Sequence, residues 1–388
     1  SSELILIVSL MGCALLFRWP ISFYENVLSG FQKMVRLNFI KIIIGIVNFG
    51  SLYFLFNFFN LKIKGYFLFL TFLYLINIII LTTSVWRVKE LKFFKAKFDL
   101  RILKQSKKYI LGIGVYSIIG TIYVVIDKII ISKFFLASEL AYYSLISMAS
   151  LSLFQFVYPI SAALFPKFVE NNAKGKNGES LDIFRKGYQL VIVLVFSFSS
   201  LLFVFKKSIF LLWTQNELVA ANSIVFLVPI LLGTVFYSLH VLVISIYTSL
   251  GKTKEINRLY VFCLALYLCL LLFSAQEKSM LWIAYSWCLS NAVLLILSYY
   301  LAIKILTFNV FLSFFKNDLI LPFLILTVIV VLSSIIEIPK MTFGHSLIAI
   351  IISLVLFLLV FSCCSSYLRS MVILQIKGTL YGENRIKK

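Results

Sequence analysis

One arginine stands near the middle of a long apolar run at residues 4–31. At 1.5 Å of helical rise per residue, roughly 20 residues cross a hydrocarbon core of about 30 Å, so Arg18 is expected near mid-depth. A central Arg costs about 2.5–3.5 kcal/mol on insertion scales, and such residues usually face a water-filled cavity or a partner. Pro20 removes a backbone donor and favours a kink beside it. This arrangement is expected on a path for something negatively charged.

Two further ionisable residues belong with Arg18 as candidate substrate-binding groups. Glu25 lies two helical turns after Arg18 on the same face, too far for a direct ion pair but able to line the same cavity. Lys41, near the cytoplasmic end of the next apolar run, has a side chain long enough to snorkel to the interface. Structural interpretations of Arg18 stay open: an ion pair with a carboxylate of a neighbouring helix, or a register that brings it to the interface.

Asp127 and His240 are the candidate ion-coupling residues. Asp127 closes the fourth apolar run near its outer end, where a carboxylate either takes up a proton or cation or marks the helix end. The adjacent Lys128 need not pair with it, because neighbouring helical residues point in different directions. His240 lies mid-run, where an imidazole could titrate or make one interhelical hydrogen bond.

Motifs for catalysis, metal binding and nucleotide hydrolysis are absent from the sequence. There is no P-loop, HExxH or GxSxG, and neither His240 nor His345 has a catalytic neighbour in sequence. The six cysteines all lie in apolar runs without metal-ligand spacing. We therefore expect no catalytic residue, no metal and no cofactor. The predicted outer loops are short, which disfavours an enzyme that acts on long glycans.

Apolar helices must hold these charged residues. The chain of 388 residues is 62% hydrophobic and 13% charged, whereas soluble domains have roughly 45–50% and 25%. The runs are continuously apolar, which excludes a transmembrane β-barrel, and Pro159 and Pro166 indicate that the fifth run is a helix that breaks and then ends. The predicted all-α polytopic bundle has about 11 transmembrane helices. They cover residues 4–31, 37–59, 65–86, 107–131, 140–165, 187–213, 222–249, 257–274, 280–304, 318–336 and 345–368.

Lys and Arg residues sort between alternate loops, 26 on one side and 8 on the other. The positive-inside rule places the larger set, and with it the C-terminus, in the cytoplasm. The net charge of +21 thus reflects membrane topology rather than nucleic-acid binding. Because eleven spans then leave residue 1 outside, we expect the chain to lack an odd number of N-terminal helices.

Loops divide the predicted spans into blocks. Residues 87–106 form a basic linker with apolar residues near helical spacing, which indicates an amphipathic helix on the anionic inner leaflet or a charge run that sets topology. We expect the remainder of a first lobe at 1–86 and a second, six-helix lobe at 107–306. Two additional helices at 307–368 and a basic cytoplasmic tail at 369–388 complete the chain.

Four segments resemble the bacterial polysaccharide flippases. These Wzx-type translocases of O-antigen and capsule repeats belong to the multidrug/oligosaccharidyl-lipid/polysaccharide exporter superfamily. One departure is Ala141, where the family often has Gly. The segments are YENVLSGFQK at 24–33, IDKIIISKFFL at 126–136, ELAYYSL at 139–145 and YPISAALFP at 158–166.

The resemblance implies a two-lobed, V-shaped transporter in the bacterial inner membrane, here without about three N-terminal helices. Its members move a lipid-linked oligosaccharide on undecaprenyl pyrophosphate to the outer leaflet, and a polysaccharide polymerase is a possible partner. A cationic lumen would accept the pyrophosphate, and Arg18 is the best positional match. Family members exchange substrate for protons or sodium, which makes Asp127, Glu25 and His240 the coupling candidates.

Two other functions stay open. A drug or small-cation antiporter of the same superfamily should have a cavity dominated by acidic residues, whereas Arg18 is the most deeply placed charge here. A membrane glycan polymerase or ligase would need large outer loops with basic or His residues, which the predicted topology lacks.

Overall fold

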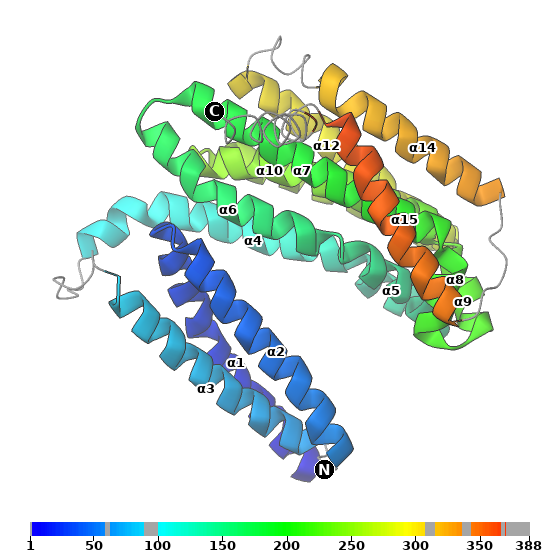
Figure 1. Ribbon diagram of the computed structural model, residues 1–388, viewed down its shortest axis with the longest axis horizontal. Helices are drawn as coiled ribbons and strands as arrows, with labels where there is room; N and C mark the ends of the chain where they lie inside the picture. Colours follow the sequence, from blue (N-terminus) through cyan, green and yellow to red (C-terminus); the bar gives the residue numbers. More distant parts are fainter. Residues whose placement is uncertain are drawn as a thin grey trace, which may run out of the picture. The chain divides into compact units, whose positions relative to one another are not determined.

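The structure is a computed structural model that describes residues 2–58, 63–88, 100–306, 315–335, 343–365 and 369. Within these ranges all regular structure is helical (Figure 1). Ten described helical segments are long and apolar enough to cross a membrane, and a further apolar helix at Ile320–Ile335 is shorter. The predicted all-helical membrane fold is confirmed. The V shape and the missing N-terminal helices stay predictions.

The described helices follow the predicted runs, with two additions. Short helices lie at the end of the run predicted at 187–213 and at the start of the run predicted at 222–249. The helices are α1 (Ser2–Gly30), α2 (Met34–Phe58), α3 (Ile63–Trp86), α4 (Leu100–Phe134), α5 (Ala137–Leu151), α6 (Phe154–Ala173), α7 (Asn177–Val204), α8 (Lys206–Thr214), α9 (Glu217–Ile224), α10 (Leu227–Ser249), α11 (Thr253–Gln276), α12 (Met280–Leu306), η2 (Phe315–Leu319), α14 (Ile320–Ile335) and α15 (Phe343–Cys364).

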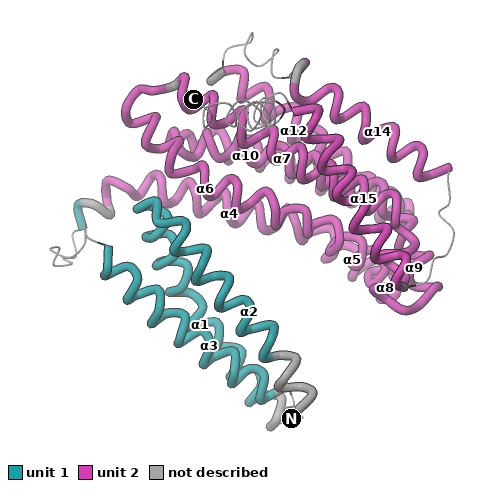
Figure 2. Tube along the Cα trace, viewed as in Figure 1, with its two compact units in different colours: residues 1–103 teal, residues 104–388 magenta. Residues whose placement is uncertain are grey.

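The chain divides into two compact units, Ser1–Leu103 and Lys104–Lys388 (Figure 2). Most of the predicted linker at 87–106 lies outside the described residues, and so does the predicted tail apart from Arg369. The division of the chain into lobes, linker and tail therefore stays a prediction at those boundaries.

The first unit is built from α1, α2 and α3. Its small apolar core includes Ile21 and Leu28 of α1 and Leu81 and Val85 of α3. The helix α1 packs along α3 and continues through Pro20 to Gly30. This packing buries one stripe of α1 and leaves the rest of its surface uncovered within the unit. Arg18 lies on the uncovered part.

The second unit is organised around α10, which packs against α12, α6, α7, α5 and α11. A helix that is apolar all round is expected to be enclosed, and α10 has buried residues on every face. It therefore forms the axis of this unit, and the side chains of α5 and α12 are positioned against it.

A close approach of α10 and α12 depends on Gly233. A Cβ atom at this position would lie 2.5 Å from Trp287 Cδ1 and 2.9 Å from the backbone Cα of Cys288. We expect Gly233→Val to destabilise the second unit by about 1–3 kcal/mol, because overpacking forces the two helices apart. Thermal unfolding in detergent measures the effect. Gly114→Val is the matched control, since nothing lies within 4 Å of a Cβ there.

The fifth predicted span breaks earlier than expected. The sequence placed the break and the end of this helix at Pro159 and Pro166, but both prolines lie inside α6, which continues to Ala173. The interruption is at Ser152 and Leu153, where Leu153 N bonds to Ser150 O and Gln155 N bonds to Ser152 O in tighter i→i−3 turns. The prediction of a broken span was right, and its position was wrong by about two turns.

A buried polar cluster joins η2 and the end of α15 to α7. Asp318 accepts hydrogen bonds from Arg185 Nε at 2.8 Å and from Gln189 Nε2 at 2.7 Å. The Ser365 hydroxyl donates to Gln189 Oε1 at 2.7 Å. Since the Asp318 side chain is fully enclosed, its charge depends on these partners.

We expect Asp318→Ala to destabilise the second unit by about 1–3 kcal/mol, because the buried Gln189 amide and the partly exposed Arg185 lose the carboxylate that they surround. The measurement is the same thermal unfolding assay. Asp182→Ala is the control, because Asp182 pairs with Lys186 at 2.6 Å on an exposed surface. An exposed pair is worth about 0–1 kcal/mol, so equal effects of the two substitutions would contradict the expectation.

Candidate functional site

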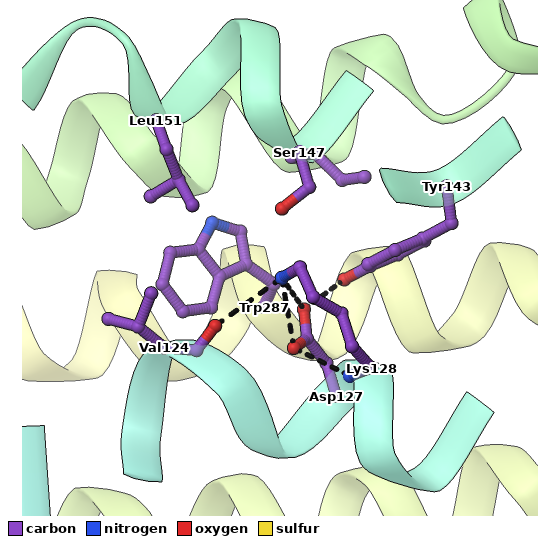
Figure 3. Close-up of a pocket in the computed structure, with 8 residues that line it drawn as sticks. Val124, Asp127, Lys128, Tyr143, Ser147, Leu151 and Trp287 are labelled. Carbon is purple, nitrogen blue, oxygen red and sulfur yellow. Dashed lines mark hydrogen bonds and ion pairs between the residues drawn. The ribbon is translucent and has the colours of Figure 1, made fainter. Parts of the chain in front are cut away.

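Asp127 is an enclosed carboxylate on α4, with 2% of its surface exposed. The Tyr143 hydroxyl of α5 donates to Asp127 Oδ2 at 2.7 Å. The Lys128 ammonium lies 3.2 Å from each carboxylate oxygen (Figure 3). The two neighbours thus pair, although helical geometry does not require it, because the Lys128 chain folds back along α4. Asp127 was expected near the helix end, but α4 continues to Phe134.

A small pocket with about 170 Å³ of empty space surrounds this pair. Figure 3 shows the Trp287 ring, Val124 and Leu151 around it, and Ser147 above it. Its walls are mostly apolar, and the space is too narrow for a water molecule. A carboxylate in such surroundings must be neutralised by a cation or a proton, because an unpaired charge there is costly.

Local capping fixes the position of Tyr143. Glu139 Oε2 accepts a hydrogen bond from the Leu136 backbone N–H at 3.0 Å at the start of α5. This contact satisfies a donor at the helix start and places a carboxylate in the first turn, both of which stabilise α5. Tyr143 follows one turn later and is directed toward Asp127.

His240 lies in a separate place, at the centre of the second unit. It is fully buried on α10, and its Nε2 is 2.6 Å from the Tyr260 hydroxyl of α11. The Tyr237 ring lies 4.8 Å away from the imidazole. Of the two roles considered for His240, the structure therefore contains the interhelical hydrogen bond. His240 does not line the Asp127 pocket.

Tyr143, Ser147 and Trp287 are the pocket residues that the sequence analysis missed. Each comes from a different turn or helix and looks like an ordinary apolar-span residue in the sequence. The sequence did offer one indication of Tyr143, because it is a hydroxyl-bearing residue on the helix that follows the one with Asp127. Tyr123, one turn before Asp127, bonds instead to Ser290 and does not line the pocket.

The first unit brings together two of its three candidate residues. Glu25 Oε2 lies 2.9 Å from Lys41 Nζ, so α1 and α2 share an ion pair. Lys41, expected to snorkel, reaches this carboxylate, and both side chains remain partly exposed. Arg18 is exposed on α1, and within the part of the chain that the structure describes it has no hydrogen-bond or ion-pair partner.

Arg18, Glu25, Lys41 and Asn48 form what we term the polar strip of the first unit. Glu25 is two turns from Arg18 on α1, and Asn48 is two turns from Lys41 on α2. Counted along the chain from the Glu25–Lys41 ion pair, Arg18 and Asn48 each lie two helical turns further from the turn that joins α1 to α2. The Asn48 amide oxygen is enclosed without a hydrogen-bond partner in the described residues. The strip therefore carries one unpaired cation and one unsatisfied polar group.

Metal-binding chemistry of the transition-metal kind finds no support in the described ranges. No group of three or more His, Cys, Asp or Glu side chains there is placed to hold a metal ion. Each unit thus has its own charged candidates: Arg18 and the Glu25–Lys41 ion pair in the first unit, and the lysine-neutralised Asp127 in the second.

Comparison with known proteins identifies a fold. No protein-family model and no curated protein matches this chain. A crystal structure of a point mutant of the Vibrio cholerae MATE transporter VcmN matches with a TM-score of 0.59 and 15% sequence identity. The match covers 75% of this chain and 67% of that one. The chain therefore shares the fold of this transporter over the matched part, and at this level of identity the likeness concerns the fold alone.

Proposed function

We propose that this chain, with its MATE-like fold, is a flippase for surface-polysaccharide biosynthesis. Its substrate would be an undecaprenyl-pyrophosphate-linked oligosaccharide repeat unit, carried from the cytoplasmic to the outer leaflet of a bacterial inner membrane. The mechanism is alternating access between two helical lobes, coupled to an ion.

The observation that carries this proposal is the unpaired charge on α1. Arg18 stands at the middle of an apolar span and has no neutralising partner in the described residues. A guanidinium forms bidentate charge-assisted hydrogen bonds with phosphate oxygens and is always charged. A pyrophosphate would therefore supply the partner that α1, α2 and α3 do not.

The polar strip favours an anionic substrate over a cationic one. Its carboxylate, Glu25, is already neutralised by Lys41. The remaining charge on the strip is positive, so a cationic drug would meet repulsion from Arg18 rather than attraction. The polar groups of Glu25, Lys41 and Asn48 are left to hydrogen-bond the sugar or the second phosphate.

Ion coupling is assigned to the second unit in this proposal. Asp127 is the stronger candidate, because its carboxylate is enclosed and its cationic partner is a flexible lysine. His240 is the weaker candidate, since its imidazole is locked among aromatic rings and bonded to Tyr260. Glu25 is engaged by Lys41.

An antiporter of drugs or small cations is the second candidate function. The observation in its favour is the buried Asp127, because a membrane-embedded carboxylate can attract a cationic substrate. The pocket around it is too narrow for a drug-sized molecule in this conformation, so the carboxylate fits an ion better.

Complementation separates the two candidates. The full-length protein is expressed in a bacterial strain that lacks its polysaccharide flippase, and in a strain sensitised by deletion of its drug exporters. The flippase proposal predicts restored surface polysaccharide in the first strain and no drug resistance in the second. Resistance without restored polysaccharide would overturn the proposal in favour of the antiporter.

A further inference from the structure

We infer that the Asp127 pocket is a binding site for an alkali cation, sodium in the first instance, and that the Lys128 ammonium is a tethered competitor that occupies it. The inference deepens the ion coupling of the proposed function and rests on it for its physiological meaning. The cation site itself is a property of α4 and α5 that can be measured without any transport.

The oxygens around the Lys128 ammonium are those that a small hard cation would use. Nζ lies 3.2 Å from Asp127 Oδ1, 3.2 Å from Oδ2 and 3.3 Å from the Val124 carbonyl oxygen. Carboxylate and backbone carbonyl oxygens are preferred ligands of hard cations. The ammonium thus sits in a ready-made cradle of three oxygens.

Two hydroxyl groups extend this cradle. The Tyr143 hydroxyl is bonded to Asp127 Oδ2 at 2.7 Å, and Ser147 lines the same pocket one turn further along α5. A hydroxyl can turn its lone pairs to a metal ion once a lysine is no longer present. A bare proton would need only the carboxylate, whereas several oxygens around one point suit a spherical ion.

Charge balance links the departure of the ammonium to the arrival of a cation. The remaining walls are apolar, and Asp127 is the carboxylate of the pocket. If Lys128 left alone, an enclosed negative charge would remain unpaired, which is strongly unfavourable. When a monovalent cation takes its place, the pocket stays neutral, so the two occupants exclude each other and exchange one for one.

The Lys128 side chain can leave the pocket, whereas the Asp127 side chain is enclosed in it. The side chain of Lys128 is 27% exposed, whereas that of Asp127 is 3% exposed. A lysine has a long flexible stem and a strongly hydrated ammonium, so it can swing from the carboxylate to water. The Tyr143 ring, whose centroid is 5.7 Å from Nζ, adds a weak cation–π attraction that holds it in place without locking it.

Exchange at this site would reach α5 directly. Tyr143 belongs to α5 and contacts both the Asp127 carboxylate and the Lys128 ammonium. A change of occupant therefore changes the contacts that join α4 to α5. Lys128 sets the threshold cation concentration for this change, since any cation must displace it first.

Equilibrium binding of radioactive sodium to the purified full-length protein tests the inference. Removing the competitor in Lys128→Gln is expected to lower the Kd for sodium by about tenfold or more. Lys128→Arg keeps a tethered cation and should leave the wild-type Kd or raise it. Asp127→Asn should abolish binding, both alone and in combination with Lys128→Gln. The matched control is Lys133→Gln, which removes an exposed charge from the same helix further along the chain.

A second measurement uses the unaltered protein and does not depend on how the variants fold. An amine-reactive reagent labels exposed lysines, and mass spectrometry follows the rate at Lys128. Labelling of Lys128 should accelerate in sodium chloride relative to a chloride salt of a large organic cation at equal ionic strength. Labelling of Lys133 should not change.

Three results would overturn the inference: a sodium Kd that is equal in wild type and Lys128→Gln, binding that survives Asp127→Asn, or Lys128 labelling that ignores sodium. A failure of the proposed function would give a different result from a failure of the cation site. If sodium binds as described while complementation restores no polysaccharide, the cation site stands and the flippase assignment falls.

Discussion

Arg18→Ala is expected to abolish translocation of the lipid-linked oligosaccharide that we propose as substrate, and Arg18→Lys is expected to retain part of it. The guanidinium binds a phosphate through two parallel hydrogen bonds, whereas an ammonium supplies only a point charge. Losing charge-assisted hydrogen bonds to the substrate costs about 1.5–3 kcal/mol, so translocation by the Ala variant should fall by a factor of about 10 to 100. Surface polysaccharide in the complemented strain, at matched levels of membrane protein, gives the measurement.

Lys33→Ala is the control for this prediction. It removes one positive charge from the exposed turn between α1 and α2 and leaves the polar strip intact. Wild-type output from Lys33→Ala with no output from Arg18→Ala would assign the effect to the position of the charge. Equal output from Arg18→Ala and wild type would remove Arg18 from the mechanism.

Asp127→Asn is expected to uncouple transport from the ion gradient. The amide keeps the size of the side chain and can still accept the Tyr143 hydrogen bond, but it cannot neutralise a cation. Lys128 then loses its anionic partner and moves to water, and the occupancy of this pocket no longer depends on the ion. Translocation driven by the gradient should fall by about tenfold or more, while thermal stability changes little.

Tyr143→Phe provides the matched comparison, because it removes one hydrogen bond to the carboxylate and keeps the ring. It should lower gradient-driven translocation less than Asp127→Asn does, because the carboxylate keeps its charge and its contact with Lys128. An Asp127→Asn variant that remains as active and as ion-dependent as wild type would place coupling elsewhere, with His240 as the next residue to examine.

The sequence was sufficient for the helical membrane fold because hydrophobic length is a local property. The length of each apolar run indicates whether it can span a membrane. Charged residues inside the runs are easily recognised, because placing a charge in the bilayer costs free energy. Arg18 and Asp127 could be selected in this way before any contact was known. The break in the fifth span was also anticipated, although its position depended on tight turns at Ser152 and Leu153 that carry no proline.

The partners of the charged residues could not be read from the sequence. Tyr143 and Trp287 reach Asp127 from other helices, and only tertiary packing brings them together. The pairing of Asp127 with Lys128 depends on a side-chain conformation, and the choice between titration and hydrogen bonding at His240 depends on Tyr260. Local pattern selects candidates, whereas packing decides which of them meet.

Reconstitution into vesicles measures whether the protein moves a lipid-linked oligosaccharide from one leaflet to the other. The purified full-length protein is placed in liposomes that contain a fluorescent undecaprenyl-pyrophosphate-linked oligosaccharide, and a membrane-impermeant quencher reports the fraction in each leaflet. For an ion-coupled flippase we expect movement between leaflets that responds to an imposed sodium gradient and is lost in Arg18→Ala. Movement no faster than in protein-free liposomes, or equal movement by wild type and Arg18→Ala, would contradict it.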